Sequence, residues 1–179
     1  MTRRLLGAVL AGGRSTRFGS DKAVASLHGV ALIDHVIEAL RPWVEQVAIC
    51  GRVGQGNLYL PDRPAADMGP LGGLCAALHQ GRTQGFDAVI SVGCDTPQLP
   101  AGLFARLLES DGAAYLATLP IIGLWPTHLA PDLDAFLGEE RKHAVRAWAD
   151  RAGAERISWD AVANINRRSD LDALRPDQG

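Results

Sequence analysis

The sequence predicts an α/β protein with a doubly wound, mostly parallel central sheet and helices on both of its faces. Its short apolar runs, at Leu5–Leu10, Val47–Cys50 and Ala88–Val92, are continuous rather than alternating, which is typical of parallel strands covered on both sides. Segments with apolar residues at helical spacing stand between these runs, giving the strand–helix order of such folds. We expect the 179 residues to form one domain over 1–179.

The first half of the chain alternates between these two kinds of element, with turns marked by glycine and proline. The other elements predicted there are an irregular segment over Ala23–Leu32 with a turn at His28-Gly29, a helix over Ile33–Leu40 closed by Pro42, an extended piece at Leu58–Leu60, a helix from Leu71 to about Gly81, and a helix over Leu103–Leu108.

The second half is less regular, but no internal repeat or linker interrupts it. Its predicted elements are strands over Ala113–Leu119 and Ile121–Trp125 joined through Pro120, helices around Leu133–Leu137 and Val145–Ala149, a strand over Arg156–Trp159, an extended piece at Ala163–Asn166, and a last helix from Ser169. The loops at 11–22, 51–57 and 93–97 follow parallel strands, so we expect them at the carboxyl edge of the sheet, where such folds bind ligands.

Composition argues against several classes of function. A net charge of −2 gives no general electrostatic attraction to nucleic acid. No apolar stretch approaches the roughly 20 residues of a membrane span, and the apolar run of six residues near the N-terminus is too short for a signal peptide. We therefore expect a cytoplasmic protein without nucleic-acid or membrane partners.

The cysteines and histidines form no recognisable sequence motif. Cys50, Cys75 and Cys94 are far apart and include no C-x-x-C pair, so the sequence indicates neither a zinc site nor a disulfide framework. We expect reduced thiols packed among apolar neighbours. None of the five histidines stands beside a plausible nucleophile or in an H-x-x-x-H pair, so each is expected at the surface or in packing.

The stretch from Leu5 to Lys22 predicts a phosphate-binding loop. A buried strand ends at Gly12-Gly13, and the loop that follows carries the cations Arg14, Arg17 and Lys22. Glycine lets backbone N–H groups converge on an anion, and the cations add charge that backbone dipoles lack. The loop matches neither the dinucleotide fingerprint nor the Walker pattern.

The loop sequence LAGGRSTRFGSDK instead resembles the nucleotidyltransferase signature L-A-G-G-x-S-x-R-M-G-x-D-K, especially that of the molybdenum cofactor guanylyltransferases, with Phe18 in place of Met. The resemblance implies a Rossmann-like nucleotidyltransferase fold and nucleotide contacts in the loop, with Arg17 and Lys22 acting on the phosphates. The implied nucleotide-binding residues of the loop are Leu10, Ala11, Gly12, Gly13 and Lys22.

Asp95 follows the predicted strand Ala88–Val92 directly, beside the phosphate loop. A carboxylate there suits Mg²⁺, which commonly takes one or two carboxylates plus substrate phosphates. An Asx-turn that only stabilises the loop explains its position equally well. Since GCDTPQLP resembles the family's C-D-x-P segment, the resemblance implies that Asp95 is catalytic and binds the metal and the nucleotide.

A second acidic segment points to the base of the nucleotide. Asp62 and the turn through Gly69 into GPLGGL resemble the family segment whose aspartate helps to read guanine. A carboxylate suits guanine because N1–H and N2–H₂ are both donors. The alternative is an ordinary surface carboxylate. The resemblance implies that Asp62 and Gly69 bind the nucleotide.

Near the C-terminus, Asn164 and Asn166 match the family's N-x-N. The resemblance implies that they orient phosphate or the acceptor side, although a structural turn explains them equally well. Two segments depart from the family. Cys50 stands where a polar residue often contacts nucleotide, so we assign it no role. The apolar segment Leu119–Trp125 replaces a more polar one near the second substrate.

The resemblance to this family implies transfer of GMP from GTP to molybdopterin with Mg²⁺ as cofactor and release of pyrophosphate. Transient contacts with other cofactor-biosynthesis proteins or molybdoenzyme apoproteins are also implied. Two alternatives stay open: a related nucleotidyltransferase whose acceptor is a sugar phosphate or another pterin cofactor, and a nucleotide-binding accessory protein with little turnover.

Overall fold

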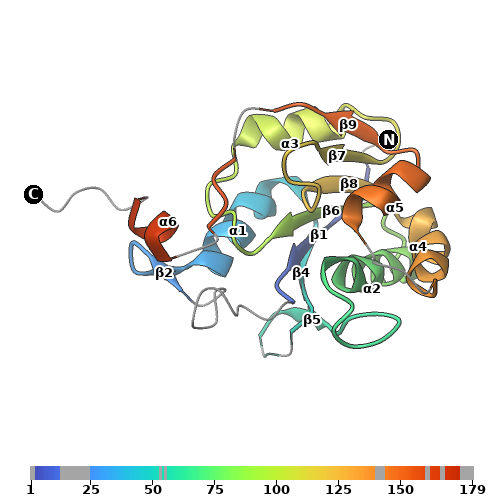
Figure 1. The fold of residues 1–179 in the computed structure, drawn as a ribbon, viewed down its shortest axis with the longest axis horizontal. Helices are drawn as coiled ribbons and strands as arrows, with labels where there is room; N and C mark the ends of the chain where they lie inside the picture. Colours follow the sequence, from blue (N-terminus) through green and yellow to red (C-terminus); the bar gives the residue numbers. More distant parts are fainter. Residues whose placement is uncertain are drawn as a thin grey trace, which may run out of the picture.

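The computed structural model describes residues 3–12, 25–52, 54, 56–139, 144–159, 162–165 and 168–173. Its main feature is a seven-stranded sheet in the order β5-β4-β1-β6-β8-β7-β9 (Figure 1). The strands are β1 (Leu5–Leu10), β4 (Gln46–Cys50), β5 (Leu58–Leu60), β6 (Ala88–Gly93), β7 (Ala114–Leu116), β8 (Gly123–Pro126) and β9 (Glu155–Ile157).

The sheet is mostly parallel, as the sequence predicts. Strand β1 pairs in parallel with β4 and β6, β4 with β5, and β7 with β9, whereas β8 runs antiparallel to both β6 and β7. After β1 the chain adds β4 and β5 on one side and then crosses to add β6 on the other. This reversal at β1 is the switch point at which doubly wound sheets bind ligands.

Helices cover both faces of the sheet, which confirms the predicted fold class (Figure 1). The helices on one face are α2 (Pro70–Thr83), α4 (Ala130–Leu137) and α5 (Val145–Arg151). Those on the other face are α1 (Leu32–Leu40), the 3₁₀ turn η2 (Arg41–Trp43) and α3 (Ala101–Leu108). The remaining elements are β2 (Ser26–Leu27), β3 (Val30–Ala31), the 3₁₀ turn η3 (Thr127–Leu129) and α6 (Arg168–Ala173).

Strand β1 shows why its sequence is apolar without interruption. Leu6, Ala8 and Leu10 pack with the α2 face of the core, whereas Leu5 and Val9 pack with the α1 face. Successive side chains of a strand point to opposite faces, so a strand buried on both sides needs apolar residues at every position.

Two local predictions differ from the structure, and one is confirmed. The segment expected to be irregular forms the hairpin β2–β3, whose turn at His28 and Gly29 was correctly predicted. Helix α1 ends at Leu40 and Pro42 lies in the 3₁₀ turn that follows it, which confirms the predicted end of the first helix. The strand expected over Ala113–Leu119 is shorter, because Ile122 donates its backbone N–H to Leu119 O and turns the chain.

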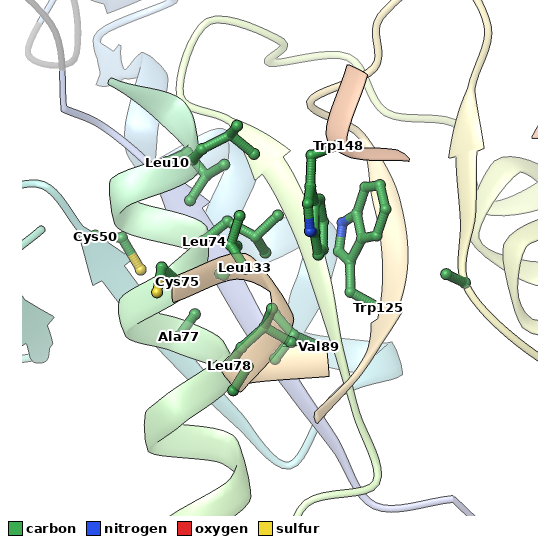
Figure 2. Close-up of a cluster of buried hydrophobic side chains, with 14 of the residues drawn as sticks. Leu10, Cys50, Leu74, Cys75, Ala77, Leu78, Val89, Trp125, Leu133 and Trp148 are labelled. Carbon is green, nitrogen blue, oxygen red and sulfur yellow. The ribbon is translucent and has the colours of Figure 1, made fainter. Parts of the chain in front are cut away.

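The core beside α2 contains a tryptophan pair. Trp125 of β8 and Trp148 of α5 lie side by side with ring centroids 4.8 Å apart (Figure 2). The indole Nε1–H of Trp125 donates a 2.8 Å hydrogen bond to Ser91 Oγ, and that hydroxyl donates to Ile121 O at 2.6 Å. Ser91 is the one polar residue inside β6, and its hydroxyl satisfies a buried donor that a tight apolar core would otherwise leave unpaired.

We expect Ser91→Ala to lower the free energy of unfolding by about 1–3 kcal/mol, because it leaves the buried Trp125 N–H without an acceptor. Urea unfolding of the wild type, Ser91→Ala, Trp125→Phe and the double variant would measure this. The double variant should lose less stability than the sum of the two single losses, because the donor and its acceptor disappear together. Additive losses would show that the pair is not coupled.

Among the described residues, no helix has the length and apolar character needed to cross a membrane.

Candidate active site

The candidate site lies at the carboxyl edge of the sheet, where β1, β4, β5 and β6 all end. Backbone hydrogen bonds continue past the strands and hold the following loops together. Ala11 N–H donates to Cys50 O at 3.0 Å, Gly51 N–H to Leu60 O at 2.9 Å, and Cys94 N–H to Leu10 O at 3.3 Å. The first residues of the loops after β1, β4 and β6 are therefore fixed relative to one another.

The loops after β1 and β4 touch through two glycines. Gly51 has φ +78°, and a Cβ built on it would lie 2.5 Å from Gly12 Cα. A Cβ on Gly12 would lie 3.1 Å from Gly51 Cα. Only glycine at both positions allows the first residues of the phosphate loop to lie against the loop after β4.

We expect Gly51→Ala to cost more than about 1 kcal/mol of folding free energy, because alanine is strained at this positive φ and also meets backbone. Gly56→Ala is the matched control: Gly56 has φ +86° but nothing within 4 Å of its Cβ position. The difference in thermal stability between the two variants isolates the clash with Gly12. Equal destabilisation would mean that the two loops separate without cost.

Asp62 follows β5 and lies against a wall of glycines. Its Oδ1 is 3.0 Å from the Cβ position of Gly51 and 3.6 Å from those of Gly12 and Gly73. This oxygen is buried and accepts no hydrogen bond from the part of the chain that the structure describes. A buried acceptor without a donor is costly, so Asp62 Oδ1 is a candidate acceptor for the hydrogen-bond donors of a ligand.

The surroundings of Asp62 raise the pKa of its carboxyl group. Burial is the largest cause, the backbone hydrogen bond from Met68 opposes it, and the negative charge of Asp67 raises the pKa further. Among the described residues, no cation contributes to this shift. Donors on a bound ligand would favour the ionised carboxylate and lower its pKa again.

The turn into α2 packs directly on Asp62. Gly69 has φ +68° and precedes Pro70, the first residue of the helix. Gly72 N–H donates to Gly69 O at 3.0 Å, and a Cβ on Gly72 would lie 3.0 Å from the Cβ and Cγ of Asp62. The glycines of GPLGG therefore bring helix backbone into contact with the carboxylate, which explains their spacing in the sequence.

On the other side of β1, the loop after β6 is built around Asp95. A Cβ on Gly93 would lie 2.5 Å from Asp95 Oδ1, so glycine there leaves room for the carboxylate. The buried hydroxyl of Thr96 donates to Gly93 O at 2.9 Å and fixes the turn. The loop geometry thus depends on both residues that flank the Cys94-Asp95 pair.

The C-terminal part of the chain joins this loop. Ile165 N–H donates to Asp95 O at 2.9 Å, which brings the neighbouring Asn164 to the same edge. Asn164 Oδ1 is buried and has no hydrogen-bond donor among the described residues. A carboxylate and an unsatisfied amide oxygen are oxygen donors of the kind that Mg²⁺ takes, so these residues fit the cation that the sequence motif implies.

Sequence comparison now places the chain. Residues 7–155 match the model of the MobA-like NTP transferase domain. The chain is 38% identical over 186 residues to a molybdenum cofactor guanylyltransferase of Cereibacter sphaeroides, covering 94% of each chain. It is 35% identical over 187 residues to one from Rhizobium leguminosarum, covering 93% of this chain and 90% of that one. The chain belongs to the molybdenum cofactor guanylyltransferase family.

Solved structures share the fold of this guanylyltransferase-family chain. The molybdopterin-guanine dinucleotide biosynthesis protein A of Archaeoglobus fulgidus superposes with a TM-score of 0.72 at 19% identity, over 95% of this chain and 96% of that one. The 2-C-methyl-D-erythritol 4-phosphate cytidylyltransferase of Thermus thermophilus gives a TM-score of 0.71 at 15% identity, over 97% of both chains. The fold is therefore common to nucleotidyltransferases named for different bases, so base choice has to come from local contacts.

The structure brings most of the predicted site residues of this guanylyltransferase-family chain to one edge of the sheet. The residues found there are Leu10, Ala11, Gly12, Asp62, Gly69, Asp95 and Asn164. Four others lie outside the described residues, namely Gly13, Arg17, Lys22 and Asn166, so their roles stay predictions.

Sequence reasoning missed Gly51 and Gly93. Their position in the sequence could have indicated them, because each is a glycine at the carboxyl end of a buried strand. Cys50, to which no role was assigned, is fully buried, and burial followed by the charge of Asp62 raises the pKa of its thiol to about 12. The thiol is therefore protonated at neutral pH and packs as an apolar group.

Proposed function

We propose that this chain transfers GMP from GTP to molybdopterin and releases pyrophosphate. The observation that carries the proposal is Asp62, whose buried Oδ1 has no donor among the described residues and faces glycines of two loops and of helix α2. Guanine presents N1–H and N2–H₂ as adjacent donors, which a carboxylate accepts together. The family membership of the chain supports the same base.

The reaction needs positioning and charge stabilisation rather than a covalent enzyme intermediate. A terminal phosphate oxygen of molybdopterin forms a bond to the α-phosphorus of GTP, and the bond from that phosphorus to the β-phosphate oxygen breaks. Asp62 and the turn at Gly69 hold the guanosine end. Backbone N–H groups of Gly12 and Gly13, with Arg17 and Lys22, stabilise the negative charge on the leaving pyrophosphate.

Asp95 would hold Mg²⁺, and the buried amide oxygen of Asn164 adds a second oxygen ligand or orients a water on the ion. When bound, Mg²⁺ would neutralise negative charge on the phosphate oxygens. Asn166 would orient the acceptor phosphate. The proposal takes residues 1–179 as one cytoplasmic domain that meets its partner proteins only transiently.

A related nucleotidyltransferase with another acceptor is a second candidate, and one observation favours it. Ile121 Cδ1 lies 3.6 Å from the Cβ position of Gly93, so an apolar side chain borders the Asp95 loop in the segment where the family is more polar. The rest of that segment, at Ile122, Leu124 and Trp125, is fully buried core. The difference from the family therefore concerns only the residues up to Ile121.

Pyrophosphate release decides between these functions. The purified protein should release pyrophosphate from GTP in the presence of Mg²⁺ only when molybdopterin is added. Release only with a sugar phosphate or another pterin cofactor would support the second candidate. Tight GTP binding without release under any condition would instead identify an accessory protein.

A further inference from the structure

On the α2 face of the sheet, away from the Asp95 loop, the structure brings together three side chains that the proposed reaction does not use. Cys75 and His79 lie four residues apart on α2, and Asp134 comes from α4, which packs against it. The thiol sulfur, one imidazole nitrogen and one carboxylate oxygen all lie within 4.8 Å of one another. Residues four apart share one face of a helix, so α2 presents both of its ligand atoms to α4.

We propose that Cys75, His79 and Asp134 form a binding site for a zinc-like divalent cation that joins α2 to α4. A thiolate, an imidazole and a carboxylate are the three kinds of protein ligand that Zn²⁺ takes. With water as a fourth ligand, these three groups would give the tetrahedral coordination that Zn²⁺ prefers. The softer sulfur and nitrogen donors select Zn²⁺ or Co²⁺ over Mg²⁺, whereas the site at Asp95 and Asn164 offers oxygen.

The contacts within the cluster support a cation. His79 Nε2 lies 2.5 Å from Asp134 Oδ2, so the imidazole and the carboxylate are in direct contact. Cys75 Sγ donates to Asp134 Oδ1 at 3.1 Å. The imidazole nitrogen and the thiol sulfur therefore both lie against the same carboxylate. A cation would bind all three groups, and the thiol proton would pass to solvent.

The surroundings close the site on one side and open it on the other. Cys75 is fully buried in the core cluster that includes Leu74, Leu78 and Leu133 of α4 (Figure 2). The side chains of His79 and Asp134 are 26% and 30% exposed, so an ion enters from solvent and stops against the sulfur. Burial of one ligand and partial exposure of the other two give an entry path without rearrangement of the core.

Arg63 is the charged group that competes with the cation. Its guanidinium Nη2 lies 3.9 Å from Asp134 Oδ2, which places a positive charge beside the carboxylate. The Arg63 side chain is 50% exposed and can turn toward water when the ion enters. Replacing Arg63 with a neutral residue should therefore strengthen cation binding. If the three side chains served only to pack α2 against α4, the replacement would have no such effect.

The test uses the full chain with Co²⁺ as a spectroscopic probe and Zn²⁺ as competitor, in excess Mg²⁺. We expect about one Co²⁺ per chain, with a thiolate-to-cobalt charge-transfer band that Zn²⁺ abolishes and Mg²⁺ does not. His79→Gln and Asp134→Asn should each weaken Co²⁺ binding by at least about 10–100-fold. His128→Gln, on an exposed histidine outside the cluster, should leave it unchanged. Arg63→Gln should strengthen it.

Thermal unfolding gives a second readout that does not depend on enzymatic activity. Zn²⁺ should raise the Tm of the wild type and of His128→Gln by mass action, but not that of His79→Gln, whose partly exposed position keeps the variant folded. The proposal is overturned if the wild type shows no thiolate band, if Mg²⁺ displaces Co²⁺, or if His79→Gln binds Co²⁺ as tightly as the wild type. None of these results bears on transfer of GMP.

Discussion

Asp95→Asn is expected to lower kcat for GMP transfer by about 10²–10³-fold, the loss typical of removing one strong electrostatic contributor. The carboxylate lies directly after β6 in a loop shaped by Gly93 and Thr96, and its backbone carbonyl holds the segment that carries Asn164. Asparagine keeps the size of the side chain and that backbone bond, so the variant removes the charge while keeping the loop.

Steady-state rates of pyrophosphate release at several Mg²⁺ concentrations would measure the effect. A requirement for much more Mg²⁺ by Asp95→Asn would place the loss at the metal. Asn164→Ala is the comparison variant, because it removes a neutral oxygen from the same edge and should cost less. Full activity of Asp95→Asn at low Mg²⁺ would remove this carboxylate from the mechanism.

Asp62→Ala is expected to weaken GTP binding by about 1–3 kcal/mol, which is roughly 5–150-fold, because the guanine donors lose their buried acceptor. Binding of CTP and ATP should change little, since neither base offers the same donor pair. Competition binding of all three nucleotides to the wild type and the variant would measure the preference. If CTP or ATP binds the wild type as well as GTP does, the assignment of guanine fails although the fold stands.

The raised pKa of Asp62 also predicts how the free energy of unfolding changes with pH. Its folded-state pKa is raised, so between the unfolded and the folded pKa the native state holds more protons than the unfolded state. Stability without nucleotide therefore falls as the pH rises through that window and stays lower above it. Asp62→Asn should remove this fall, and GTP binding to the wild type should release a proton there. Unfolding curves against pH, and calorimetry in two buffers, would detect both.

The fold could be predicted from patterns of apolar residues within short segments of the chain. Apolar residues at every position of Leu5–Leu10 identified a strand buried on both faces, and the spacing through Leu71–Leu78 identified α2. What the sequence could not predict was the antiparallel direction of β8, because a four-residue strand reads alike in both directions. Pro120 correctly marked the turn that the bond from Ile122 N–H to Leu119 O closes, but β7 ends earlier, at Leu116.

The position of Asp95 after a buried strand made it a candidate, whereas Asp62 was singled out by the resemblance to the family, and the roles of both residues stay predictions. The site was not predictable where function depends on how two distant loops touch. Nothing in the sequence around Gly51 indicates that its Cβ would meet Gly12. The cluster of Cys75, His79 and Asp134 was missed for the same reason, because its third member comes from another helix.

The hydrogen bond between Ile165 N–H and Asp95 O limits how early the complete edge of the sheet can form during synthesis. The strands β1, β4, β5 and β6 are all complete by Gly93, so the edge that carries Asp62 can form while the second half of the chain is still being translated. The Asp95 loop can form its backbone hydrogen bond with Ile165 only after residue 165 has left the ribosome. In a nascent chain, the part of the edge that carries Asp62 could therefore form well before the contact between the Asp95 loop and Ile165.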